Sequence, residues 1–330
     1  MTAMIVDVRE NPGDALRKAA TLLREGSLVA FPTETVYGLG ANALDGEAVR
    51  KIFKAKGRPG DNPLIVHVAD IQDVHKVAFV PELGTRLMEK FWPGPLTLVM
   101  PARRIVPPEV TAGLATVAVR MPAQPVALEL IRLAGVPVAA PSANLSGRPS
   151  PTEAGAVEED LGDSVEMILD GGATQVGVES TVLDISGEKA ALLRPGGLSL
   201  EALEEFLGYC PILPGAGGAV AGRSPGTRYR HYAPRIPLLL REDGSVWSKA
   251  AAWEPARRAY VGIRPPEGEF AFVRLFPDTE SYARGLFSAL RELERSGACV
   301  IVADWPAEDR LGLALRDRLK RASGGSFFAD

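Results

Sequence analysis

The chain has 330 residues, which is longer than one typical domain. Hydrophobic residues make up 46% of it, enough to form two hydrophobic cores. Its net charge of −4 argues against a protein that coats nucleic acid through bulk charge. Cys210 and Cys299, the two cysteines, imply neither a disulfide framework nor a cysteine-rich metal site. No apolar run is long enough for a membrane span. The apolar stretch at the N-terminus is too short for a signal peptide, and charged residues follow it too closely. We therefore expect a soluble, cytoplasmic protein.

Hydrophobic periodicity predicts alternating strands and helices over the first 210 residues. Strands are expected at 4–8, 27–31, 64–68, 96–100, 117–120, 136–140, 167–170, 181–185 and 191–194. Helices are expected at 14–24, 48–55, 82–91, 125–134, 153–161 and 200–207. This order is typical of an α/β fold, and the short strands around glycine-rich turns at 171–197 indicate antiparallel pairing there.

Glycine and proline interrupt this pattern between Pro211 and Pro237, which predicts a linker. Beyond it, strands are expected at 237–240, 259–263, 270–275 and 299–303, and helices at 246–253, 280–295 and 306–321. The sequence therefore predicts a first domain at 1–210, a linker at 211–236 and a smaller α/β domain at 237–330.

The segment 54–67 is rich in cations, glycine and proline and runs directly into an apolar strand that contains His67. Lysine and arginine in such a rigid loop can bind several oxygens of one phosphate group. A solvated basic loop is the alternative. The histidine argues against it, because buried strand positions rarely carry histidine without a partner or a task.

Two further segments, 33–40 and 141–152, follow apolar strands and are rich in hydroxyl groups. The first suits a small polar ligand at a sheet edge, but taken alone it is better explained by an ordinary strand-to-helix turn. The second, with Asn144 and Arg148, is placed to hold phosphate or ribose oxygens; a polar loop capped at Thr152 is the alternative. Nothing near Ser142 supplies a base, so a nucleophilic role is not indicated. No P-loop signature is present in the sequence.

The linker concentrates charge and aromatic rings between Arg223 and Arg235, with four arginines, Tyr229, His231 and Tyr232. This composition indicates a lid that closes over an anionic, planar ligand by ion pairing and stacking. Contact with single-stranded nucleic acid uses the same chemistry and is the alternative.

Taken together, these segments resemble a known family. The motifs are Lys56-Gly-Arg58 with Asn62-Pro-Leu-Ile-Val-His67, Trp92-Pro-Gly-Pro-Leu-Thr97, Val119-Arg120-Met-Pro, Pro141-Ser-Ala-Asn144 and Ser150-Pro-Thr. They are similar to the YrdC-like domain up to about residue 208. The linker motif at 224–234 and the segment after it resemble the long form of the threonylcarbamoyl-adenylate synthases. The resemblance implies an α/β fold, with an open twisted mixed sheet, a concave basic cleft and a smaller Rossmann-like α/β C-terminal domain.

The resemblance also implies a nucleotidyltransferase reaction. L-threonine, bicarbonate or carbon dioxide, and ATP are condensed to threonylcarbamoyl-AMP and pyrophosphate, for tRNA threonylcarbamoyladenosine modification. We expect no protein nucleophile, with Lys56 and Arg58 acting by positioning. Mg²⁺ is expected on the polyphosphate of ATP, without a visible protein-built metal site.

The site residues follow by motif match. The residues implied for ATP are Lys56, Arg58, Asn62, Thr116, Ser142, Asn144, Ser150, Arg194 and Tyr232. Those implied for threonine are Thr35, His67, Arg120, Ala140 and Ser180, with Arg120 as the partner of the carboxylate.

Partners follow from the same resemblance. A downstream threonylcarbamoyl transferase is expected to take the product. Weak binding of tRNA or double-stranded RNA is left as an open alternative. We expect a monomer or weak dimer that makes no contact with a membrane. Two other functions stay as alternatives. One is an RNA-binding module of translation. Salt-sensitive RNA binding that ATP and threonine do not change would favour it. The other is carbamoyl transfer as in hydrogenase maturation, whose proteins carry zinc-finger and acyl-phosphatase parts not seen here.

Overall fold

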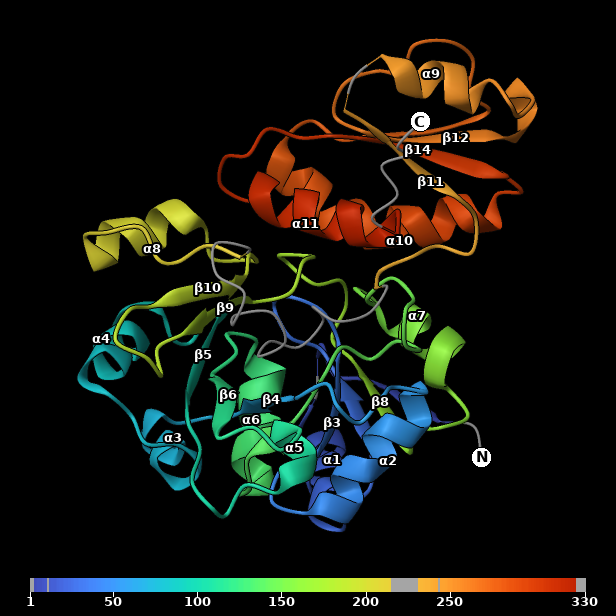
Figure 1. Cartoon of the computed structure of the whole chain (residues 1–330). Coiled ribbons are helices and arrows are strands. Elements are labelled where there is room, and N and C mark those ends of the chain that lie inside the picture. Colours follow the sequence, from blue (N-terminus) through green and yellow to red (C-terminus); the bar gives the residue numbers. More distant parts are fainter. Residues whose placement is uncertain (1–2, 11, 215–230, 243, 325–330) are drawn as a thin grey trace.

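The computed structural model describes residues 3–10, 12–214, 231–242 and 244–324, which form a larger and a smaller α/β unit (Figure 1). The strands of the larger unit are β1 (Met4–Asp7), β2 (Val29–Phe31), β3 (Gly38–Asn42), β4 (Ile65–His67), β5 (Leu96–Pro101), β6 (Thr116–Arg120), β7 (Val138–Ala139), β8 (Met167–Asp170), β9 (Thr181–Asp184) and β10 (Ala191–Arg194). Its helices are α1 (Gly13–Arg24), α2 (Gly46–Lys56), α3 (Ile71–Val77), α4 (Glu82–Phe91), α5 (Pro108–Thr111), α6 (Pro125–Ala134), α7 (Ala154–Leu161) and α8 (Leu200–Leu207). The α/β class expected from the sequence is confirmed.

The ten strands of the larger unit form one mixed sheet in the order β1-β8-β2-β3-β7-β4-β6-β5-β9-β10. The antiparallel pairing expected near residues 171–197 is confirmed by β9 and β10. Strand β4 pairs in parallel with β6, in a register that sets His67 opposite Arg120. The sheet therefore brings together two residues that are 53 positions apart in the sequence.

Helix α2 delivers the basic loop to the sheet. Asp45 caps its N-terminus by accepting hydrogen bonds from the backbone amides of Glu47 and Ala48. Gly57 ends it with φ +58°, a left-handed conformation that glycine adopts without strain. The helix therefore stops at Lys56, and the chain turns toward Arg58.

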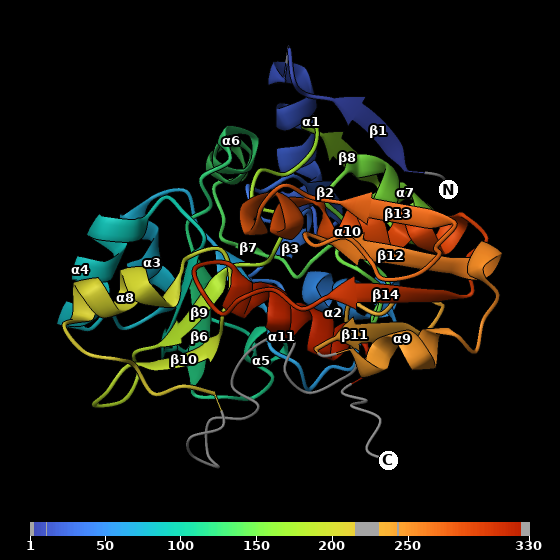
Figure 2. The same ribbon diagram turned by 90° about the horizontal axis from the view of Figure 1, so that it is seen from above.

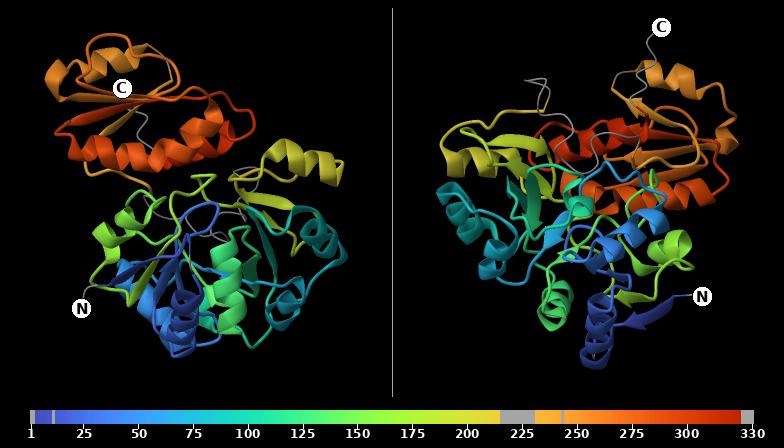
Figure 3. Two further views of the ribbon diagram at one scale, coloured as in Figure 1. Left: turned by 180° about the vertical axis from the view of Figure 1, so that it is seen from behind. Right: turned by 60° about the horizontal axis from the view of Figure 1, so that its bottom comes forward.

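The smaller unit is built on a parallel sheet. Its elements are β11 (Leu238–Arg241), α9 (Ser245–Ala250), a 3₁₀ turn at Pro255–Arg257, β12 (Arg258–Gly262), β13 (Phe272–Leu275), α10 (Thr279–Arg295), β14 (Val300–Asp304) and α11 (Gly312–Ala322). The strand order is β11-β14-β12-β13. Helices α10 and α11 cover the face that looks toward the larger unit, and α9 covers the other face (Figures 1 and 3). Seen from above, the unit leaves α4 and α6 uncovered (Figure 2).

Buried ion pairs and close backbone contact join the two units. Arg291 of α10 donates to both carboxylate oxygens of Asp160, at 3.1 and 2.6 Å, and Arg148 pairs with Glu294 at 2.7 Å. A Cβ at Gly177 would lie 2.3 Å from the Cα of Arg284, so the loop can meet α10 this closely only as glycine. The smaller unit therefore rests directly on the loops that follow the strands of the larger one.

Some elements differ from the sequence-based expectation. The sequence predicts a turn where the structure has strand β3, because glycines lower strand propensity. Glycine is required at Gly40, because a Cβ there would lie 2.8 Å from the Phe31 ring. The last helix begins at Gly312 rather than at residue 306. Helices α3 and α5 were not expected. Thr152 does not cap α7, whose N-cap is Glu153 without a side-chain hydrogen bond.

Most of the lid motif, at residues 215–230, lies outside the described residues; His231 and Tyr232 lie within them. Among the described residues, none of the helices combines the length and apolar composition needed to cross a membrane.

Candidate active site

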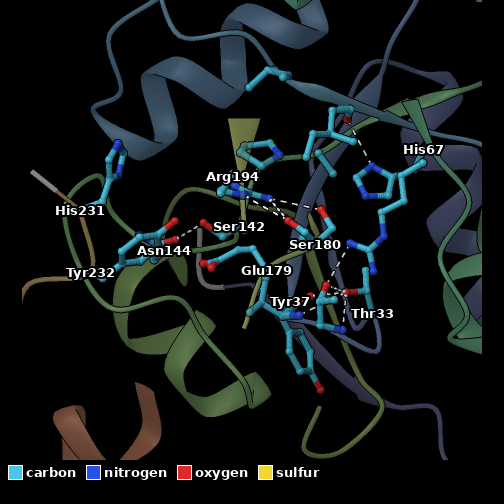
Figure 4. A pocket seen from close by; sticks show the side chains of 18 of the residues that line it. Thr33, Tyr37, His67, Ser142, Asn144, Glu179, Ser180, Arg194, His231 and Tyr232 are labelled. Atoms are coloured by element: carbon cyan, nitrogen blue, oxygen red, sulfur yellow. Dashed lines mark hydrogen bonds between the residues drawn. The ribbon is translucent and has the colours of Figure 1, made fainter. Parts of the chain in front are cut away.

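A pocket opens where the ends of β4, β6 and β10 meet the loops after β2 and β7 (Figure 4). Of the fourteen residues expected to bind ATP or threonine, ten line it: Thr35, Arg58, His67, Arg120, Ala140, Ser142, Asn144, Ser180, Arg194 and Tyr232. In Figure 4, His67 and Thr33 lie on one side, His231 and Tyr232 on the other, and Arg194 between them. Residues that are far apart in the sequence thus share one cavity.

Arg120 organises one end of the pocket. Its Nη2 donates to Glu34 Oε1 at 2.6 Å, its Nη1 to Thr35 Oγ1 at 2.9 Å and its Nε to the Gly94 carbonyl at 3.2 Å. The other Glu34 oxygen accepts the Ala123 amide at 3.0 Å. The ion pair is buried, so its geometry is held tightly by these hydrogen bonds. Three of the five guanidinium N–H groups are engaged, which leaves two for a ligand.

His67 lies beside Arg120 as a neutral imidazole. Burial, and then the neighbouring Arg120 charge, lower its pKa to about 3. Its Nδ1 lies 3.2 Å from the Ile65 carbonyl, and its ring meets Phe31 edge-on. The imidazole is therefore a hydrogen-bonding group at neutral pH rather than a cation.

The opposite end of the pocket carries two arginines. Burial lowers the pKa of Arg58 to about 10, and the Arg194 charge adds to this effect, yet the group stays protonated at neutral pH. Arg58 Nη2 donates to the carbonyls of Asn62 and Pro63, at 3.3 and 3.2 Å. Arg194 donates to the Ser180 carbonyl at 2.9 Å. Ser142 Oγ donates to Asn144 Oδ1 at 2.5 Å. This end can hold a polyanion.

The other four expected residues do not line the pocket. Lys56 is buried behind it, where Nζ donates to the carbonyls of Ser142 (2.6 Å) and Asn144 and fixes that loop. Asn62 is buried, and its backbone carbonyl accepts from Arg58; Ser150 Oγ donates to Glu179. Thr116 begins β6, at the end of the strand far from Arg120. A strand of five residues separates the two ends, so Thr116 lies away from the pocket.

The motif match missed Glu179 and His231, which line the pocket, and also Glu34, a buried carboxylate that pairs with the pocket residue Arg120. Each is next to an expected residue in the sequence, which is the one signal that the sequence offers. An acidic residue is not an obvious component of an anion-binding site. Only the structure shows that Glu34 is paired with Arg120, and that burial and then Arg58 lower the pKa of His231 to about 4.

Comparisons with known proteins match the whole architecture. Residues 21–196 match a family described as "Telomere recombination" (Sua5, YciO and YrdC), and residues 198–324 match the threonylcarbamoyl-AMP synthase C-terminal domain. The chain is 47% identical to threonylcarbamoyl-AMP synthase of Pyrococcus abyssi, over 97% of this chain and 98% of that one. It is 45% identical to the Bacillus subtilis protein of that name, over 94% and 93%.

Solved structures agree. The crystal structure of P. abyssi Sua5 complexed with L-threonine matches with a TM-score of 0.91 and 48% identity, covering 98% of each chain. The Escherichia coli YciO structure matches the fold over 59% of this chain, with a TM-score of 0.54 and 22% identity. With both of its units matched and with relatives this similar over almost the full length, the chain belongs to the threonylcarbamoyl-AMP synthase family.

Proposed function

We propose that this protein is an L-threonylcarbamoyladenylate synthase. It condenses L-threonine, bicarbonate or carbon dioxide, and ATP to threonylcarbamoyl-AMP and pyrophosphate, for tRNA threonylcarbamoyladenosine modification. The observation that carries this proposal is a single pocket with two chemically different ends. One end has Arg120, Thr35 and neutral His67, and the other has Arg58 and Arg194. Two ligands of different charge can therefore meet within one cavity.

At the Arg120 end we assign L-threonine. The two unengaged N–H groups of Arg120 suit the amino-acid carboxylate, because a guanidinium fork matches a carboxylate in geometry and charge. Thr35, Ser180 and His67 are the polar groups around it, and Ala140 supplies a small apolar wall. The threonine hydroxyl and amine find hydrogen-bond partners among these groups. The P. abyssi Sua5 structure with L-threonine bound supports the assignment.

At the opposite end we assign ATP. Arg58 and Arg194 supply positive charge, and Ser142 and Asn144 supply hydroxyl and amide groups for the phosphates and ribose. Tyr232 offers an aromatic face. We propose that Lys56, Asn62 and Ser150 serve the ATP end from outside the pocket lining: the Lys56 and Ser150 side chains are hydrogen-bonded to neighbouring protein groups, and the Asn62 carbonyl accepts from Arg58. No cluster of three or more metal-binding side chains occurs within the described part of the chain. We therefore propose that Mg²⁺ enters the pocket bound to the phosphate oxygens of ATP.

The reaction needs no protein nucleophile. The neutral amine of threonine adds to carbon dioxide and loses a proton, which gives a carbamate. A carbamate oxygen then attacks the α-phosphorus of ATP, and the bond to the bridging oxygen breaks to release pyrophosphate. Arg58 and Arg194 stabilise the charge that develops on the phosphates, and Arg120 holds the carbamate donor in line. The mixed anhydride that results is an activated acyl donor, so we propose that a threonylcarbamoyl transferase consumes it.

We also propose the division of labour along the chain: a catalytic domain at 1–210, a linker at 211–236 that acts as a lid, and a C-terminal domain at 237–330. The described end of the linker supports this idea. Tyr232 lines the pocket, and the Ala233 amide donates to the Gly147 carbonyl at 2.8 Å.

The test is pyrophosphate release from ATP in the presence of bicarbonate, with and without L-threonine. We expect release only when threonine is present. For Arg58→Ala we expect a loss of at least about 100-fold in kcat/KM, because the variant removes one positive charge that faces the polyphosphate. Arg104→Ala is the control, since that arginine is exposed and lies outside the pocket. ATP turnover that is indifferent to threonine would contradict the proposal.

A further inference from the structure

One arginine of the C-terminal unit reaches the wall of the pocket. Arg318 of α11 is completely buried, with 0% of its surface exposed. Its Nε donates to Glu179 Oε2 at 2.6 Å, and its Nη1 donates to the Pro195 carbonyl at 3.0 Å and to Asp317 at 2.6 Å. A buried arginine on the second unit is thus hydrogen-bonded to a carboxylate that lines the pocket of the first.

Glu179 links this arginine to the ATP end. Its second carboxylate oxygen accepts the Ser150 hydroxyl. Burial opposes its ionisation, but the charges of Arg318 and Arg194 outweigh burial and lower its pKa below the usual value. Glu179 is therefore an anion in the wall of a site that must receive polyphosphate. Unless a cation neutralises it, its charge cancels part of the field of Arg194.

The same arginine supports the linker. The guanidinium carbon of Arg318 lies 5.4 Å from the centroid of the Tyr232 ring, a cation–π contact. Tyr232 has φ +65° and stacks on Phe287 of α10 at 5.3 Å. Non-glycine residues hold this left-handed conformation only where the surroundings impose it. The surroundings here are the two helices of the C-terminal unit.

We propose that Arg318 is a positioning residue for the ATP half of the reaction, an inference that rests on the proposed function. It neutralises Glu179, so that Arg58 and Arg194 present their full positive charge to the polyphosphate. The C-terminal unit is thereby part of the active-site electrostatics, and the pocket has its full affinity for ATP only when α11 is docked.

The experiment compares Arg318→Met with the double variant Arg318→Met/Glu179→Gln and with Arg318→Lys, in the full-length protein. For Arg318→Met we expect KM for ATP to rise about tenfold or more, with the affinity for L-threonine, measured by calorimetry, changed by less than about twofold. The double variant removes both buried charges, so KM for ATP returns to within about threefold of wild type. Arg318→Lys keeps the charge and also stays within about threefold.

Arg291→Met is the matched control. Arg291 of α10 is likewise a buried arginine paired with a buried carboxylate of the larger unit, but that carboxylate, Asp160, does not line the pocket, whereas Glu179 does. We expect it to lower the melting temperature as Arg318→Met does while leaving KM for ATP unchanged.

Three outcomes would overturn the inference: equal changes in KM for ATP in both arginine variants, no rescue by Glu179→Gln, or an unchanged KM in Arg318→Met. If Arg318→Met does not fold, the double variant and Arg318→Lys still decide, because a tenfold loss in either one contradicts charge neutralisation. Absence of threonine-dependent pyrophosphate release in the wild-type protein would instead refute the proposed function itself.

Discussion

At the scale of single residues, burial and neighbouring charges set which groups in and around the pocket are neutral and which are charged. His67 and Arg120 lie opposite each other across neighbouring strands, and the cation helps to keep the imidazole neutral. Glu34 balances Arg120 without consuming its whole hydrogen-bonding capacity. The cost of burying these groups is offset by the hydrogen bonds they make, which is the usual condition for buried charge.

The neutral His67 makes stability depend on pH. Its folded pKa of about 3 lies below the ordinary value of 6.5, so the unfolded chain binds more protons between these two pH values. Stability is therefore lost as the pH falls from about 6.5 toward 3, by up to about 1.4 kcal/mol per pH unit. We expect His67→Gln to remove about 2 kcal/mol of the difference in unfolding free energy between pH 7 and pH 5, measured by urea unfolding.

His75→Gln is the control for this prediction, because His75 is exposed on α3. An unchanged pH dependence in His67→Gln, or an equal change in both variants, would show that the buried imidazole is not the source.

At the scale of elements, the basic loop depends on where α2 ends. The sequence pattern predicts a helix at 48–55, and the structure extends it to Gly46–Lys56, with the cap at Asp45 and the stop at Gly57. Those two residues direct Arg58 toward the pocket and leave Lys56 buried behind the pocket, where it is hydrogen-bonded to the loop at residues 142–144. A helix one residue longer would carry Arg58 round to another face, since successive helical residues are turned by about 100°.

Replacing Gly57 by alanine tests this role. The position is open, with no atom within 4 Å of an added Cβ, so the cost is conformational and comes from the left-handed φ. We expect Gly57→Ala to lower the free energy of unfolding by about 1 kcal/mol, and Gly57→Asn by less, because asparagine tolerates this region. Chemical denaturation of the three proteins measures the difference. Equal stability of all three would mean that the loop relaxes without strain.

At the scale of the whole molecule, charge joins the two units at buried positions. Arg291 and Asp160 have only 3% and 1% of their side chains exposed, and Arg291 also donates to the Pro149 carbonyl at 2.7 Å. These contacts hold the smaller unit over the loops that line the pocket. The two units are therefore held together partly by buried charge outside the pocket lining.

Breaking this pair tests the docking. Arg291→Met leaves the buried Asp160 carboxylate uncompensated, so we expect a loss of about 3–5 kcal/mol in the free energy of unfolding. Arg295→Met, from the exposed Arg295–Glu159 pair on the same helix, is expected to cost less than about 1 kcal/mol. Denaturant unfolding compares the two. Similar small losses in both variants would mean that the units do not depend on the buried pair.

The sequence alone determined the α/β class and most helices and strands, while the ten expected residues that line the pocket were named through their match to the motifs of a known family. These features depend on local periodicity, capping and motif spacing, which are encoded over short stretches such as 45–57 and 141–152. It failed where local propensity and tertiary contact conflict, as in β3, whose glycines are required by the Phe31 ring.

Only the tertiary structure decided which polar residues face the pocket and which stand behind it. Four residues that the motif match assigns to ATP do not line the pocket: Lys56, Asn62 and Ser150 are buried, and Thr116 lies at the far end of β6. Glu34, Glu179 and Arg318 gain their roles from partners 86 and 139 positions away in the sequence. Such pairing depends on strand order and on the docking of α11, which the spacing of residues along the chain does not reveal.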